Sequence, residues 1–240
     1  AAVTATAGAW PVDSQGTYAH LGCTWLGRLV QAGLRGDPRT LFFSAAGDAR
    51  DYDYAAVVSD TMAWAVDLDD VINALVVARE DVLMVLCDHM IYQFTGDPAA
   101  GGKQDVVDKA IGAAWDAWCI GPGNIIYFYG NVGGIWALAP GGAPPRRISQ
   151  QIEERLNNSV NLNDSKVSLA WNHAHQCLEV WVTPYEPLEN GVKYLWEERT
   201  NAWWPEEYSR KEHAPLSVAI IDGPSSDDRF VLVGGRDGYI

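Results

Sequence analysis

Short apolar runs separated by turn residues follow one another along almost the whole chain. They are five to eight residues long, are rich in Val, Ile, Tyr, Phe and Trp, and end at Gly, Asn, Asp or Pro. Runs of this kind are typical of β-strands, and helical periodicity is nearly absent. The exception is 149–157, where Ile152 and Leu156 lie four apart behind a serine; this predicts a two-turn helix capped by Ser149.

The predicted strands fall into five groups joined internally by tight turns. The first four groups comprise 21–25, 28–32, 40–44 and 51–54; 72–78, 82–87, 90–95 and 104–107; 117–120, 125–129, 135–138 and 146–148; and 167–171, 177–183, 192–197 and 202–204. The fifth comprises 216–221, 229–233 and the start of a strand at Tyr239. The alternating segment 1–7 is expected to be a strand that completes the last group and closes a ring.

One aromatic residue recurs in the third run of a group, after a polar or glycine turn. Its positions are Tyr92, Trp136, Tyr194 and Tyr239, and the predicted helix accounts for the one longer separation. A period near 45 residues with four strands per unit predicts an all-β fold, a β-propeller of about five to six four-stranded antiparallel blades. Stacked blades bury the two faces that a lone sheet leaves open. A β-sandwich is the alternative, because its strands come at similar spacing.

The domain organisation follows from this repeat. We expect a single propeller domain over 1–240, a fragment of a longer chain. Its blades are predicted near 18–55, 70–110, 115–149, 165–205 and 215–240.

Composition narrows the class of function. The chain has 240 residues, a net charge of −14 and 48% hydrophobic residues, which is typical of a globular protein. An isoelectric point near 4.6 argues against a protein that grips DNA or an anionic membrane, because both require a basic face. The four cysteines lie in apolar stretches without a C-x-x-C pair, so we expect buried thiols; they are Cys23, Cys87, Cys119 and Cys177.

No familiar catalytic motif is present. The sequence lacks G-x-S-x-G, H-E-x-x-H and a phosphate-binding loop, so we expect no enzyme, no catalytic or metal-binding residue and no cofactor. His173 and His175 have the spacing of half a zinc site, but a solvated turn is the favoured interpretation.

Carboxylates cluster in the runs GDARDYDY and VDLDD. One possible function of these carboxylates is a glycosidase-like catalytic pair. Another is a calcium-binding loop built from Asp67, Asp69 and Asp70. The favoured interpretation is an acidic rim or channel lining, formed by Asp48, Asp51, Asp53, Asp67, Asp69 and Asp70.

Most of the eleven tryptophans fall within predicted strands. Trp203 and Trp204 are expected at an exposed strand end, as interface anchors. Because aromatic faces also stack on sugars, a carbohydrate-binding or glycoside-processing propeller is the alternative function.

Three segments resemble the tail hub and nozzle proteins of short-tailed bacteriophages. In residues 23–54 an R-L-x-x-A-G strand is followed by an S-x-x-G-D-x-x-D-Y hairpin, as in that family. Residues 72–112 resemble the family's next blade, and 125–138 (IIYFYGNVGGIWAL) the blade core after it. The resemblance covers roughly residues 20–140.

The resemblance implies a non-enzymatic virion protein, assembled in the host cytoplasm. Such proteins form a ring, commonly six-fold, below the portal and adaptor proteins. They continue the DNA channel, retain packaged DNA and dock tail fibres or spikes. Double-stranded DNA would pass through without specific binding, since an acidic wall repels its phosphates; no membrane is involved. The net charge would equally serve solubility.

Overall fold

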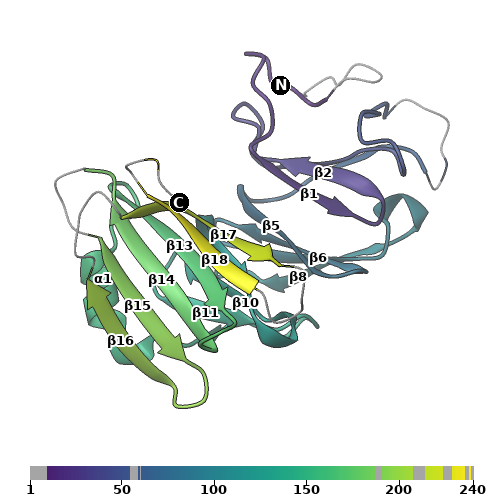
Figure 1. The fold of residues 1–240 in the computed structure, drawn as a ribbon. Helices are drawn as coiled ribbons and strands as arrows, with labels where there is room; N and C mark the ends of the chain where they lie inside the picture. The colour runs from purple at the N-terminus through teal and green to yellow at the C-terminus, as the bar shows by residue number, and fades with distance from the viewer. Residues whose placement is uncertain are drawn as a thin grey trace. The chain divides into compact units, whose positions relative to one another are not determined.

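The computed structural model describes residues 10–54, 59, 61–186, 191–207, 214–223, 229–235 and 238 (Figure 1). The strand expected at 1–7 and the aromatic position at Tyr239 lie outside the described residues. Within them the fold is all-β, as predicted: five antiparallel sheets and one short α-helix.

Strands join their sheets in chain order. The first sheet contains β1 (Leu21–Trp25), β2 (Arg28–Ala32), β3 (Thr40–Phe43) and β4 (Trp64–Asp67). The second contains β5 (Ile72–Arg79), β6 (Val82–Cys87), β7 (Ile91–Thr95) and β8 (Lys103–Asp108). The third contains β9 (Ala113–Ile120), β10 (Ile126–Gly130), β11 (Ile135–Leu138) and β12 (Arg146–Arg147). The fourth contains β13 (Ser165–Asn172), β14 (Cys177–Pro184), β15 (Val192–Glu197) and β16 (Ala202–Glu207), and the fifth β17 (Pro215–Asp222) and β18 (Arg229–Gly235).

Each four-stranded sheet is a simple meander in which consecutive strands are neighbours. A propeller blade is built in this way, whereas a Greek-key sandwich passes strands from one sheet to the other. The repeated aromatic position is confirmed in three sheets, because Tyr92, Trp136 and Tyr194 all lie on the third strand. Tyr92 and Tyr194 are buried, and Trp136 is half-buried.

One predicted strand is wrong. Residues 51–54 were expected to end the first sheet, but β4 takes that place and pairs with β3, from Thr40 opposite Asp67 to Phe43 opposite Trp64. The first sheet therefore extends to residue 67, beyond the predicted blade boundary at 55. The alternating aromatics of 51–54 serve packing instead, because Tyr52 and Tyr54 pack with Leu34 and Phe42.

The chain divides into two compact units, residues 1–115 with 140–144 and residues 116–139 with 145–240. In the first unit β1 contacts β5, and the two sheets share one apolar core in which Phe43 lies 6.1 Å from Phe94 between ring centroids. In the second unit β13 contacts both β10 and β17. The β1–β5 and β13–β17 contacts join the first strands of successive sheets, and β10 is the second strand of its sheet. Contact between successive sheets near their first strands is what radial stacking of blades requires.

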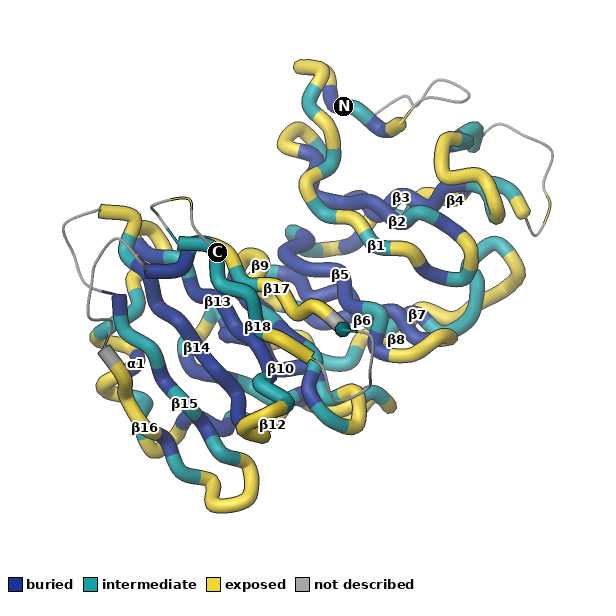
Figure 2. The backbone as a smooth tube through the Cα atoms, in the orientation of Figure 1, coloured by how far each residue is buried: buried dark blue, intermediate teal, exposed yellow. Residues whose placement is uncertain are grey.

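Aromatic rings fill the core of the second unit. Tyr127 stacks on Trp171 at 5.5 Å between centroids and meets the edge of Trp196 at 5.8 Å. Gly121 allows this packing, since a Cβ at that position would lie 2.5 Å from the Tyr127 ring. Figure 2 shows the resulting burial, with β14 dark along its length and β12 at the surface.

The predicted helix is confirmed as a 3₁₀ turn, η3 (Gln150–Ile152), that continues into α1 (Glu153–Ser159). Leu156 is fully buried, but the predicted cap is wrong. The Ser149 side chain makes no capping bond; it is buried, and its Oγ accepts a hydrogen bond from Ile135 N at 2.9 Å. Two further 3₁₀ turns are η1 (Pro98–Ala100) and η2 (Pro122–Asn124). In the described ranges no helix has the length and apolar character needed to cross a bilayer.

Candidate functional site

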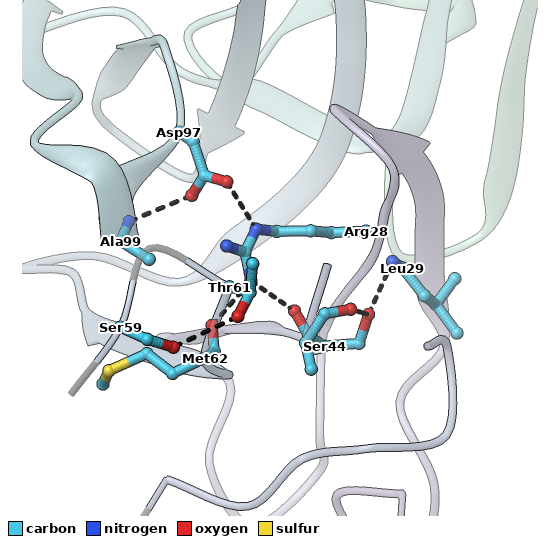
Figure 3. A network of polar contacts seen from close by, with 9 residues as sticks. Arg28, Leu29, Ser44, Ser59, Thr61, Met62, Asp97 and Ala99 are labelled. Atoms are coloured by element: carbon cyan, nitrogen blue, oxygen red, sulfur yellow. Dashed lines mark hydrogen bonds and ion pairs between the residues drawn. The ribbon is translucent and has the colours of Figure 1, made fainter. Parts of the chain in front are cut away.

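A buried arginine organises the segment that carries the phage-tail resemblance. Arg28 begins the R-L-x-x-A-G motif on β2 and is 1% exposed. Its Nε donates to Asp97 Oδ2 at 2.8 Å, and its NH1 donates to the carbonyls of Ser44 at 2.8 Å and Met62 at 2.6 Å (Figure 3). Asp97 also accepts a bond from Ala99 N at 3.0 Å. One guanidinium thus joins β2 of the first sheet, the loop between β3 and β4, and the turn that follows β7 of the second sheet.

The second motif, S-x-x-G-D-x-x-D-Y, is bound to the first by hydrogen bonds. Ser44 Oγ accepts from Leu29 N at 2.9 Å, and the Tyr52 hydroxyl donates to the Leu29 carbonyl at 3.2 Å. Gly47 N donates to the Gly27 carbonyl at 2.8 Å. Gly47 has a φ of +80°, a conformation that favours glycine. The two motifs are therefore one hydrogen-bonded unit, which we call the motif unit (residues 27–33 and 44–52).

The carboxylates of the motif unit shape its turns. Asp48 Oδ1 accepts from Arg50 N and Asp51 Oδ1 accepts from Asp53 N, both at 2.9 Å. These are Asx-turn contacts, in which an aspartate folds the backbone that follows it. Asp48 is exposed, and Asp51 and Asp53 are half-buried.

The second acidic run connects β4 to β5. Asp67 Oδ1 accepts from the Thr40 hydroxyl at 2.5 Å, and Asp70 Oδ1 accepts from Val71 N at 2.9 Å. Asp69 is exposed, and its backbone N donates to the Tyr92 hydroxyl at 3.3 Å. The six predicted aspartates thus lie in two segments of the first unit, the loop after β3 and the stretch from the end of β4 to β5.

The two predicted anchor tryptophans have different environments. Trp203 is 9% exposed, its Nε1 donates to the Ile148 carbonyl at 3.2 Å, and its ring lies 6.1 Å from that of Trp196. It is a core residue, so the expectation of an exposed Trp203 is wrong. Trp204 points to the opposite face of β16 and is 46% exposed. The alternation of side chains along a strand separates the two.

The histidine pair lies in the turn between β13 and β14. His175 N donates to Asn172 Oδ1 at 3.1 Å, and His173 Nε2 lies 3.1 Å from the guanidinium of Arg229. Within the described ranges, no group of three or more His, Cys, Asp or Glu side chains is placed to hold a metal ion.

The four cysteines are free thiols, and three of them are buried. Burial raises the pKa of Cys23 to about 12, and burial together with nearby glutamates raises the pKa of Cys177 to about 11. Burial also raises the pKa values of Cys87 and Cys119. Thiols of this kind are poor nucleophiles and poor metal ligands.

A cavity of about 590 Å³ lies in the second unit. The first strands of three successive sheets, β9, β13 and β17, contribute to its wall. The polar side chains that line it are Asp116, Asn124, Lys166, Ser168, Ser217 and Arg229. Lys166 Nζ lies 3.7 Å from Asp116 Oδ2, and Trp118 provides an aromatic side chain. We call this the second-unit cavity.

The second-unit cavity could not be predicted from the sequence, because its residues come from three separate strand groups. In the structure, Trp115 and Asp116 are both exposed and break the alternation of β9.

Neither a protein-family model nor a curated protein matches this chain. It is similar to a crystal structure of the extracellular domain of a protein described as a hybrid two-component system from B. thetaiotaomicron, with a TM-score of 0.55 and 14% identity. The match covers 92% of this chain and 25% of that one, so the chain spans a quarter of the length of that crystallised extracellular chain. At this identity the similarity concerns the fold alone.

Proposed function

We propose that this chain is a non-enzymatic structural component of a bacteriophage tail. It is a propeller that assembles into a ring, commonly of six copies, and continues the DNA channel below the portal and adaptor proteins. Its place in the virion is to retain packaged DNA and to dock tail fibres or spikes.

The motif unit is the observation that carries this proposal. The residues on which the phage-tail resemblance rests, among them Arg28, Ser44, Gly47 and Tyr52, each make a specific contact within one hydrogen-bonded unit. A short sequence resemblance is better supported when the residues that make it up also contact one another in the structure. Because Arg28 also binds Asp97 in the turn after β7 of the next sheet, the unit ties two sheets together, which suits the wall of a channel.

An exposed aromatic surface on the fourth sheet supports assembly. Trp204 lies opposite Leu195 and on the same face as Glu206, whose carboxylate is 3.2 Å from Lys193 Nζ. Lys193 also pairs with Glu179 at 3.2 Å and lies over the Trp181 ring. Exposed tryptophans are enriched at protein–protein interfaces, so Trp204 is the candidate anchor of this surface.

Sedimentation velocity over a wide protein concentration range tests the proposal. We expect a discrete species near six times the 26.3 kDa monomer mass, and no shift when double-stranded DNA is added at physiological salt. Trp204→Ser should dissociate the ring, and Tyr185→Ser, which removes another exposed aromatic of the fourth sheet region, serves as the matched control. A monomer at every concentration would overturn the proposal.

A further inference from the structure

The second-unit cavity has the dimensions of a small-molecule site. Its volume of about 590 Å³ falls within the range of roughly 300–1,000 Å³ typical of ligand pockets. It also combines hydroxyl, amide, ammonium and carboxylate groups with the indole of Trp118.

The charge of the cavity differs from that of the chain. Two cationic side chains, Lys166 and Arg229, line it together with one carboxylate, Asp116. The lining is therefore net positive by one charge, although the chain carries −14. A lining of this charge attracts a monoanion, and Asp116 opposes a doubly charged group such as phosphate.

One residue at the cavity has an unusual backbone conformation. Asp116 has a φ of +51° although it lies within β9, whereas Asn124, with a φ of +59°, lies in the hairpin turn between β9 and β10. The other described non-glycine residues with positive φ lie in hairpin turns; they are Leu26, Gln176 and Asn201. A left-handed residue inside a strand re-aims its side chain and costs about 1–3 kcal/mol, and such residues concentrate at functional sites.

We propose that the second-unit cavity binds a small sugar that carries one carboxylate, of the hexuronate type. Lys166, with Arg229, pairs with the ligand's carboxylate. Ser168, Ser217 and the Asn124 amide offer donors and acceptors for its hydroxyl groups. Trp118 provides a ring face for the sugar's C–H groups. Asp116 accepts from a hydroxyl and remains paired with Lys166.

Binding is measured by isothermal titration calorimetry with the intact chain at low salt. The probes are glucuronate, glucose and acetate. Glucose has the same ring without the carboxylate, and acetate has the carboxylate without the ring. We expect glucuronate to bind at least about tenfold more tightly than either, because both parts of the ligand are recognised.

Lys166→Met tests the assigned contact, since it keeps the apolar stem and removes the charge. It should weaken glucuronate binding by about tenfold and leave any weak glucose binding unchanged. Lys109→Met, an exposed lysine of the first unit, is the matched control and should bind as the wild type does. Circular dichroism melting curves show that each variant folds.

Saturation-transfer NMR gives a second measurement that tolerates weak affinity. It should show contact of glucuronate ring protons with the wild-type protein and loss of that contact in Trp118→Ala. Absence of glucuronate binding, equal binding of glucose or acetate, or an equal effect of Lys109→Met would each overturn the inference. None of these outcomes depends on ring assembly.

Discussion

Arg28 Nε and Asp97 Oδ2 lie 2.8 Å apart and connect the second strand of the first sheet to the turn that follows β7. The arginine side chain is fully buried, and the aspartate is 19% exposed. The same guanidinium satisfies two backbone carbonyls, so its removal leaves three acceptors without their donor.

Arg28→Met should therefore lower the free energy of unfolding by about 3 kcal/mol, because breaking a buried pair leaves an uncompensated charge. Chemical denaturation measures the change. Arg199→Met is the control: Arg199 pairs with Glu197 at 3.2 Å but is 83% exposed, and its loss should cost less than about 1 kcal/mol. Equal effects of the two substitutions would contradict the role given to Arg28.

The adjacent residues Trp203 and Trp204 allow a contribution to folding stability to be compared with a contribution to assembly. Trp203→Ala removes a buried ring and its bond to the Ile148 carbonyl, and should cost about 3–5 kcal/mol of stability. Trp204→Ala should leave monomer stability within about 1 kcal/mol and weaken assembly. The measurements are denaturant melts and sedimentation of the same two variants. The assignment fails if Trp204→Ala unfolds the chain or Trp203→Ala leaves it unaffected.

Asp13 makes the stability of the first unit depend on pH in the acidic range. Its pKa is lowered to about 2 by the Thr17 hydroxyl and by the backbone amides of Thr17, Gln15 and Gly36. A carboxyl with a depressed folded-state pKa stabilises the fold above its unfolded value of 3.8, and this contribution is lost as the pH falls toward 2.

The stability difference between the wild type and Asp13→Asn should therefore be constant at neutral pH and shrink between about pH 4 and pH 2. Thermal melting over this range measures it. Thr17→Val removes the largest cause and should move the Asp13 titration, followed by carboxyl NMR, back toward its usual pKa. If the stability difference between the wild type and Asp13→Asn grew as the pH fell, the Asp13 carboxylate would not stabilise the fold in the way described.

The cysteine thiols should be unreactive in the folded protein. With pKa values raised to about 12 for Cys23 and about 11 for Cys177, fewer than about one thiol in a thousand is ionised at pH 8. A thiol-specific disulfide reagent should label the native chain slowly and all four cysteines rapidly in guanidinium. Rapid stoichiometric labelling of the native chain would show an accessible thiolate.

Sequence patterning predicted strands well where a run was both apolar and bounded by turn residues. β2, β6 and β15 begin and end at the predicted residues. The fourth strand of the first sheet was missed because β4 has mostly exposed residues and little alternation, whereas Tyr52 and Tyr54 alternate without forming a strand. The pattern of apolar residues along the chain indicates which side chains are buried. A buried segment need not pair with a neighbouring strand.

The site was less predictable than the fold. The acidic rim or channel lining expected at the six aspartates stays a prediction. The Asx turns at Asp48 and Asp51 follow from backbone conformation that the sequence expresses only weakly. Lys166 and Arg229 carry no local signal, because the charge of the second-unit cavity arises when strands distant in sequence meet.

We propose that this chain folds into a propeller and that its copies assemble into a ring around a channel. Two-dimensional class averages of the purified chain from negative-stain electron microscopy test it most directly. We predict annular particles with a central opening and rotational symmetry, commonly six-fold. Isolated compact particles without an opening, at concentrations where the protein does not aggregate, would contradict ring assembly.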